Sequence, residues 1–298
     1  MQARDVSTRG SHGSQAARIR IVESKGSAAT AAATPLVLLH DGLASHETFL
    51  ATMGHLSSSF RVVAPDLPGF GASEKPDPHR YPYGYDGFAD SIADLIAALG
   101  LGRVHVCGHA MGGGVALALA ARHPALVHKL VLVDALVYPA DELVLDRAGR
   151  VPVVGSLLWH QLMGHAFFRS YVESSVYAGA RAVPAGRVDA FYASFNSPAA
   201  RQAAHATVVA KADTRSLVAR LPRITAESLV VWGRDDAMAP VEHGRRLARA
   251  LKGRFEVLEC GRCPPDEEPA AFAAVVASFL QSTPSCRAPS SRSMPHVP

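Results

Sequence analysis

Residues 104–114 read VHVCGHAMGGG and lie between a β-branched run and an alanine-rich segment, residues 115–122. The pattern predicts a buried strand, a very tight turn and a helix that leaves the sheet. In a G-x-S-x-G turn this geometry presents the middle side chain above the strand ends, and the glycines allow strand and helix to pass closely. Gly108 and Gly112 occupy the glycine positions, but the middle residue is Ala110, whose methyl group replaces a hydroxyl.

The composition predicts a globular protein with one large core. The chain has 298 residues, of which 48% are hydrophobic, and a formal net charge of +4. Its basic residues are dispersed, so we expect no nucleic-acid partner. We also expect no membrane span and no secretory signal, and therefore a cytoplasmic protein. The polar ends, residues 1–17 and 282–298, are predicted to be disordered.

Four cysteines are too few for a disulfide framework. Cys260 and Cys263 form a C-x-x-C pair, but the chain offers no second pair of ligands at zinc-site spacing. Cys260 also ends a strand-like run, whereas a redox cysteine is expected at a helix N-terminus. We interpret the pair as coincidental and predict no metal and no cofactor.

Buried strands and helices alternate through most of the chain, which predicts an α/β fold with a mainly parallel sheet covered on both faces. Strands are expected at residues 18–22, 35–39, 61–64, 104–109, 129–133, 228–232 and 255–259. Helices are expected at 84–99 and 267–281, the latter with Asp266 as N-cap. The pattern stops over residues 138–222, which are rich in aromatic residues and predict a helical lid between two parts of the core, 18–137 and 223–281.

Four motifs occur in an order that resembles the α/β-hydrolase superfamily, in its lid-bearing branch of esterases, epoxide hydrolases, haloalkane dehalogenases and C–C bond hydrolases. Residues 61–73, RVVAPDLPGFGAS, are similar to the family's strand-and-turn signature, and residues 108–113, GHAMGG, to its G-H-S-M-G-G. Residues 232–236, WGRDD, resemble the loop that delivers the catalytic acid. Residues 261–269 resemble the segment that delivers the histidine. The resemblance implies an α/β-hydrolase fold.

Compared with the family pattern, the chain differs at the positions that carry the catalytic residues. Ala110 replaces the nucleophile, Arg262 replaces the histidine, and Asp41 replaces the glycine of a His-Gly pair. Asp236 remains in the position of the acid, and Asp134 matches an alternative acid position used by some dehalogenases. Alanine forms no covalent intermediate, and arginine remains protonated at neutral pH and is no general base.

The remaining candidates have alternative interpretations. Asp236 and Arg262 form either a buried ion pair or a unit in which Arg262 faces the pocket and holds an anionic group. Through the family resemblance, the backbone N–H groups of Gly42 and Met111 map to the oxyanion hole.

Three further side chains flank this hole. Asp41 either disturbs it, supplies a base or has a structural role. His40 and His109 are expected to be mainly structural.

Three functional hypotheses follow. The first is non-hydrolytic chemistry, such as cyclisation, elimination or isomerisation of a small carbonyl compound. The second is a catalytically silent protein that binds a ligand or partner, and the third is a hydrolase with an unusual base, such as a lid histidine. The first two hypotheses predict a small-molecule pocket between core and lid.

Overall fold

The computed structural model describes residues 1–10, 15–24, 33–138, 144–151, 153–180, 182–211 and 213–283. Within these residues, eight strands form one sheet in the order β1-β2-β4-β3-β5-β6-β7-β8. Pairing is parallel from β4 through β8 and antiparallel at β1–β2 and β2–β4. The strands are β1 Gln2–Ser7, β2 Arg18–Glu23, β3 Leu36–Leu39, β4 Val62–Pro65, β5 Val104–His109, β6 Val127–Val133, β7 Glu227–Gly233 and β8 Arg254–Leu258. The predicted α/β fold with a mainly parallel sheet is confirmed.

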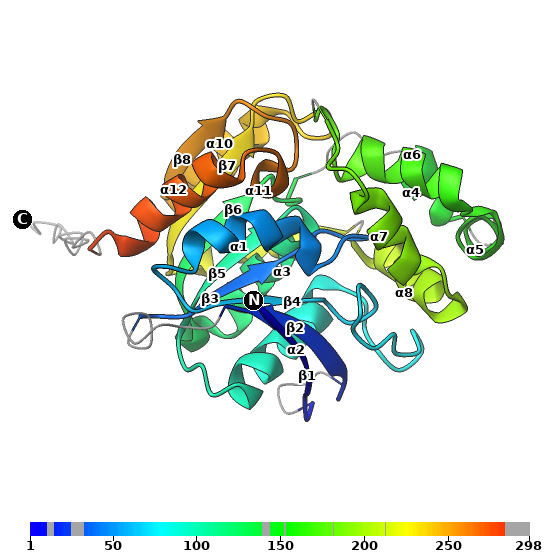
Figure 1. Cartoon of the computed structure of the whole chain (residues 1–298), viewed down its shortest axis with the longest axis horizontal. Helices are drawn as coiled ribbons and strands as arrows, with labels where there is room; N and C mark the ends of the chain where they lie inside the picture. Colours follow the sequence, from blue (N-terminus) through cyan, green and yellow to red (C-terminus); the bar gives the residue numbers. More distant parts are fainter. Residues whose placement is uncertain are drawn as a thin grey trace, which may run out of the picture.

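The central strands consist mostly of buried apolar residues, and helices cover both faces of the sheet (Figure 1). Along β3, Leu36 and Leu38 pack with α1 and α12 on one face, whereas Val37 and Leu39 pack with α2 and α3 on the other. The helices and short helical turns of the core are η1 His46–Phe49, α1 Leu50–Leu56, α2 Tyr85–Ala98, α3 Met111–Arg122, η2 Pro124–Leu126, η4 Leu221–Arg223, α10 Val241–Leu251, α11 Pro264–Glu267 and α12 Pro269–Gln281.

The first strand was not expected, because residues 1–17 predict a disordered tail. Gln2–Ser7 instead pairs antiparallel with β2 at the edge of the sheet. Val6 is buried there, and Asp5 forms an ion pair with Arg20 at 2.7 Å, as Arg4 does with Glu23. Cross-strand charge pairs and ladder hydrogen bonds stabilise a segment whose composition carries little apolar signal. The predicted C-terminal tail lies almost entirely outside the described residues.

A helical region is inserted between β6 and β7, where the lid was predicted (Figure 1). It contains α4 Val144–Gly149, α5 Val154–Leu157, η3 Leu158–Leu162, α6 His165–Ser175, α7 Arg187–Phe195, α8 Pro198–Lys211 and α9 Arg215–Arg220. The lid has an aromatic core of its own, in which Phe168 stacks on Phe195 and Trp159 contacts Tyr171 edge-to-face. The aromatic residues of this segment therefore serve first to hold the lid together.

An ion-pair cluster joins the lid to the core. Arg187, at the start of α7, donates to both carboxylate oxygens of Asp266 at 3.0 and 3.1 Å and to Glu47 at 3.1 Å. Tyr177 donates to the same Asp266 carboxylate at 2.6 Å. The prediction that Asp266 caps the last long helix is wrong, because α12 begins at Pro269 and the Asp266 side chain is engaged by the lid.

Near the start of β5 and β6, His105 stacks on His128 with ring centroids 4.9 Å apart. Burial, together with the positive charges of His128, Lys129 and Arg103, lowers the pKa of His105 to about 4. In the unfolded chain a histidine is protonated below about pH 6.5, so unfolding takes up a proton as the pH falls. This group therefore destabilises the fold progressively as the pH falls below about 6.5.

We predict that His105→Gln reduces the loss of unfolding free energy between pH 7 and pH 5 by about 1–2 kcal/mol. The measurement is urea denaturation at the two pH values, with the exposed His55→Gln as the matched control. Equal pH dependence in wild type and His105→Gln would contradict the assignment.

Candidate functional site

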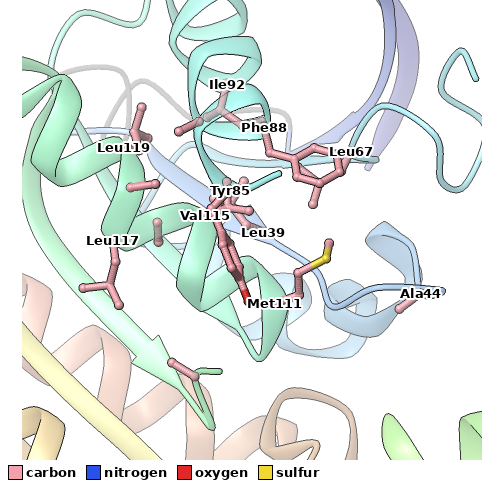
Figure 2. Packing of buried hydrophobic residues seen from close by; sticks show 14 of the residues in the cluster. Leu39, Ala44, Leu67, Tyr85, Phe88, Ile92, Met111, Val115, Leu117 and Leu119 are labelled. Atoms are coloured by element: carbon pink, nitrogen blue, oxygen red, sulfur yellow. The ribbon is translucent and has the colours of Figure 1, made fainter. Parts of the chain in front are cut away.

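The turn between β5 and α3 holds Ala110 in a strained conformation. Its φ and ψ are 49° and −109°, a region that non-glycine residues rarely adopt. A Cβ atom on Gly108 would collide with the backbone of Gly112, and one on Gly112 would collide with the carbonyl of Leu39. Figure 2 shows Leu39, Tyr85, Met111 and Val115 among the buried side chains that pack around the start of α3. The sequence prediction of strand, tight turn and helix is confirmed, and the Ala110 side chain is fully buried.

The two backbone N–H groups predicted to form an oxyanion hole converge, but on a side chain of the protein itself. Gly42 and Met111 donate to Asp41 Oδ1 at 2.8 and 3.0 Å. These distances are those expected between an oxyanion and its donors. No residue in the described ranges donates to the second oxygen, Oδ2. The Asp41 carboxylate thus accepts both of the N–H groups that the family resemblance assigns to an oxyanion hole.

Arg262 is paired with Asp236, as both predicted alternatives require. Arg262 Nη1 donates to Asp236 Oδ2 at 2.9 Å, and both side chains are inaccessible to solvent. Asp236 Oδ1 accepts from the N–H groups of Met238 and Ala239 at 2.8 and 3.1 Å. Burial opposes the charge on Arg262, but the carboxylates of Asp236 and Asp41 outweigh burial and raise the guanidinium pKa. Within the described part of the chain, Arg262 Nε has no hydrogen-bond partner.

Asp134 lies beside this pair, at the end of β6. Its Oδ1 accepts from the N–H of Gly233 at 3.0 Å, and its Oδ2 has no partner among the described residues. Burial, followed by the negative charge of Asp236, raises the pKa of Asp134 well above its usual value. Asp134 therefore holds its proton more tightly than an ordinary carboxyl group does.

The two histidines that flank the site bind backbone groups. His40 Nε2 accepts from the N–H of Leu67 at 2.9 Å, so its Nδ1 carries the proton and donates to the Asp41 carbonyl at 2.6 Å. His109 Nε2 lies 2.7 Å from the Arg262 carbonyl and donates to it. Burial lowers the pKa of both rings. These contacts agree with the structural role expected from the sequence.

A small pocket lies between this group and the lid. Its volume is about 20 Å³, which is enough for about one water molecule. Asp41 and Arg262 supply its charged groups on the core side, and Ser175 and Lys211 lie on the lid side. The other lining residues are Gly42, Leu43, Phe70, Leu136, Tyr171, Ala204, Thr207, Val208 and Met238. These lid residues could not be predicted, because no motif in the sequence marks which faces of the lid helices point inward.

The C-x-x-C cysteines do not belong to this pocket. Cys260 and Cys263 are free thiols and buried, and burial raises the pKa of both. Thiols of this kind are poor nucleophiles and poor metal ligands. Among the residues that the structure describes, no cluster of three His, Cys, Asp or Glu side chains is arranged to hold a metal ion. None of the helices described is both long and apolar enough to cross a bilayer.

The model of the alpha/beta hydrolase fold family matches residues 34–269, most of the chain. The chain belongs to the α/β-hydrolase fold family. It is 31% identical to a 2-hydroxymuconate semialdehyde hydrolase from Pseudomonas sp. over 83% of this chain and 86% of that protein. It is 32% identical to a 2-hydroxy-6-oxo-2,4-heptadienoate hydrolase from Pseudomonas putida over 84% of this chain and 90% of that protein.

Among solved structures, an enol-lactonase from Burkholderia xenovorans superposes with a TM-score of 0.75 at 22% identity. The match covers 94% of this chain and 100% of that chain. At this level of identity the likeness concerns the fold, and it agrees with the sheet and the inserted helices described above.

We predict that Arg262→Met lowers the free energy of unfolding by about 3–5 kcal/mol, because it leaves Asp236 buried without its counter-charge. Adding Asp236→Asn should restore part of the loss, since the amide oxygen still accepts from the N–H groups of Met238 and Ala239. The measurement is urea denaturation. Arg215→Met, which breaks the exposed pair with Asp213, is the control and should leave the midpoint unchanged. If Arg262→Met lowered the free energy of unfolding as little as Arg215→Met does, the result would argue against a buried ion pair.

Proposed function

We propose that this hydrolase-fold protein performs non-hydrolytic acid–base chemistry on a small carbonyl compound, such as an isomerisation, elimination or cyclisation. The observation that carries the proposal is the carboxylate of Asp41. Two backbone N–H groups hold Oδ1, while Oδ2 is left without a hydrogen bond from the described residues, and Asp41 lines the pocket. A fixed carboxylate with one oxygen available is an oriented general base.

This chain lacks the residues that the family's nucleophilic mechanism requires. Ala110 provides no nucleophile, Arg262 provides no general base, and the oxyanion donors already hold Asp41. We therefore interpret the family's catalytic triad as degenerate here.

A lid histidine does not supply the missing base, because the lining residues of the pocket include none among those described. His165 pairs with the exposed Asp189 at 2.7 Å, and His160 contacts Ser156 at 3.1 Å. These contacts argue against a hydrolase with an unusual histidine base.

The charged groups of the pocket suit proton abstraction next to a carbonyl. Asp41 Oδ2 takes the proton from carbon, and the electron pair of the broken C–H bond moves onto the carbonyl oxygen. The guanidinium of Arg262, which lines the same pocket, stabilises the resulting enolate. Asp236 holds Arg262 in place through the ion pair at 2.9 Å. The relatives named above are hydrolases of carbonyl-containing compounds by name, which supports a carbonyl substrate.

A catalytically silent binding protein is the second candidate. It is favoured by the size of the pocket, which holds about one water molecule, and by the pairing of Arg262 with Asp236. Under this interpretation the same residues form a structural cluster, and ligand binding has no chemical consequence.

Proton abstraction separates the two candidates. We expect the wild-type protein to exchange the α-hydrogens of acetone, cyclohexanone or hydroxyacetone for deuterium in D₂O, followed by NMR. Asp41→Asn should lower the exchange rate about 10²–10⁴-fold, because the amide accepts no proton at neutral pH. Asp213→Asn, in the exposed part of the lid, should leave the rate unchanged. A wild-type rate equal to that of buffer would favour the silent protein.

A fluorophosphonate probe should leave the wild-type protein unlabelled, because Ala110 has no hydroxyl. We expect the double variant Ala110→Ser/Arg262→His to remain a poor esterase toward p-nitrophenyl acetate, because Asp41 still fills the oxyanion hole. Adding Asp41→Gly should raise the rate about 10²–10³-fold. Full activity in the double variant would show that Asp41 does not block the hole, and stoichiometric labelling of the wild type would refute the proposed function.

A further inference from the structure

The oxyanion hole of this protein presents a hydrogen-bond acceptor instead of donors. In a hole with free N–H groups, the bound ligand contributes the oxygen atom. Here Gly42 and Met111 have given their N–H groups to Asp41 Oδ1. An ionised carboxylate only accepts hydrogen bonds, so Oδ2 is complementary to an N–H or O–H group.

The lid supplies a second polar group that points to a ligand. Ser175, the last residue of α6, is 9% exposed and lines the same pocket. Its Oγ is buried and has no hydrogen-bond partner within the described residues. A buried hydroxyl without a partner is costly, so a bound molecule or water is expected to pair with it. Because a hydroxyl both donates and accepts, Ser175 tolerates either kind of group on the ligand.

The charges around the pocket disfavour an anionic ligand. The positive charge of Arg262 is partly offset by the ion pair with Asp236 at 2.9 Å. Lys211 lies on α8, at the lid side of the pocket. A carboxylate that enters beside Asp41 would therefore meet a like charge in a site with little water to screen it.

We propose that the pocket selects its ligand by a hydroxyl or amino group that donates a hydrogen bond to Asp41 Oδ2, and that it rejects carboxylates. The inference rests on the proposed function, because it names the class of substrate for the same site. It implies a carbonyl compound that carries a hydroxyl or amine near the reacting carbon. The apolar walls, among them Leu43, Phe70 and Val208, suit a short hydrocarbon body.

Four probes of equal chain length test the head-group preference: propan-1-ol, propylamine, propionaldehyde and propionate. Affinities are measured by titration while the amide NMR signals of Gly42 and Met111 are followed. We expect propan-1-ol or propylamine to bind at least about tenfold more tightly than propionate. The affinities of propan-1-ol and propylamine are compared directly. Similar affinities indicate selection by the hydrogen bond, and a higher affinity for propylamine indicates an added ionic contribution. Both results support the proposal.

Two substitutions at residue 41 should reverse the order. In Asp41→Asn the amide oxygen still accepts from Gly42 and Met111, but the NH₂ group now donates into the pocket. Propionaldehyde and propionate should therefore bind more tightly than they do to wild type. In Asp41→Gly the backbone N–H groups become free, and propionate should gain about tenfold or more. Asp213→Asn serves as the control and should keep the wild-type order.

The proposal is overturned if wild type binds propionate as tightly as the donors, if Asp41→Asn keeps the wild-type order, or if no probe shifts either amide signal. These outcomes are distinct from failure of the proposed reaction. If the protein prefers hydrogen-bond donors but exchanges no α-hydrogen, the proposed ligand preference stands and the proposed reaction is refuted. If it exchanges α-hydrogens without preferring donors, the proposed reaction stands and the ligand preference is refuted.

Discussion

The site depends on a close contact of backbone with backbone at the turn after β5. Gly112 passes so near the carbonyl of Leu39 that a side chain could not be accommodated, and Gly108 meets the same constraint against Gly112. This contact brings the N–H of Met111 beside the end of β3, where it converges with the N–H of Gly42 on one oxygen. The glycines are thus required by the fold itself. The fold does not require a hydroxyl at residue 110, so the turn keeps its geometry with alanine there.

Asp41 and Arg262 are physically connected. Two buried N–H groups without an acceptor would be costly, and the carboxylate of Asp41 supplies the acceptor. That carboxylate adds a negative charge to a region that already contains Asp236, and Arg262 is a permanent cation in the same cluster. A neutral histidine at position 262 would leave both carboxylates without a counter-charge. The carboxylate at residue 41 and the guanidinium at residue 262 therefore stabilise each other, whatever chemistry the pocket performs.

Sequence alone predicted the sheet and the meeting of the site residues, because apolar runs define buried strands and parallel strands bring their carboxyl ends together. The resemblance to the family implied that Asp236 lies near Arg262 and that the N–H groups of Gly42 and Met111 converge. Sequence alone missed β1, whose stability comes from cross-strand charge pairs, and it misassigned Asp266, which binds Arg187 of the lid. The contact of Asp41 with two N–H groups depends on a side-chain rotamer, and the position of Ser175 depends on lid packing. Neither property has a periodic signature in the chain.

The lid is tied to the core at two places, and one of them lies close to the pocket wall. Arg187, at the start of α7, binds Asp266, and Arg220, at the end of α9, binds Asp86 of α2 with two hydrogen bonds. The lid side of the pocket is formed by residues of α6 and α8, the helices that flank Arg187 in the chain. Tyr177, which follows α6, binds the same Asp266 carboxylate. Since the cavity holds about one water molecule, a larger ligand requires its walls to move, and an outward shift of α6 is opposed by these contacts with Asp266.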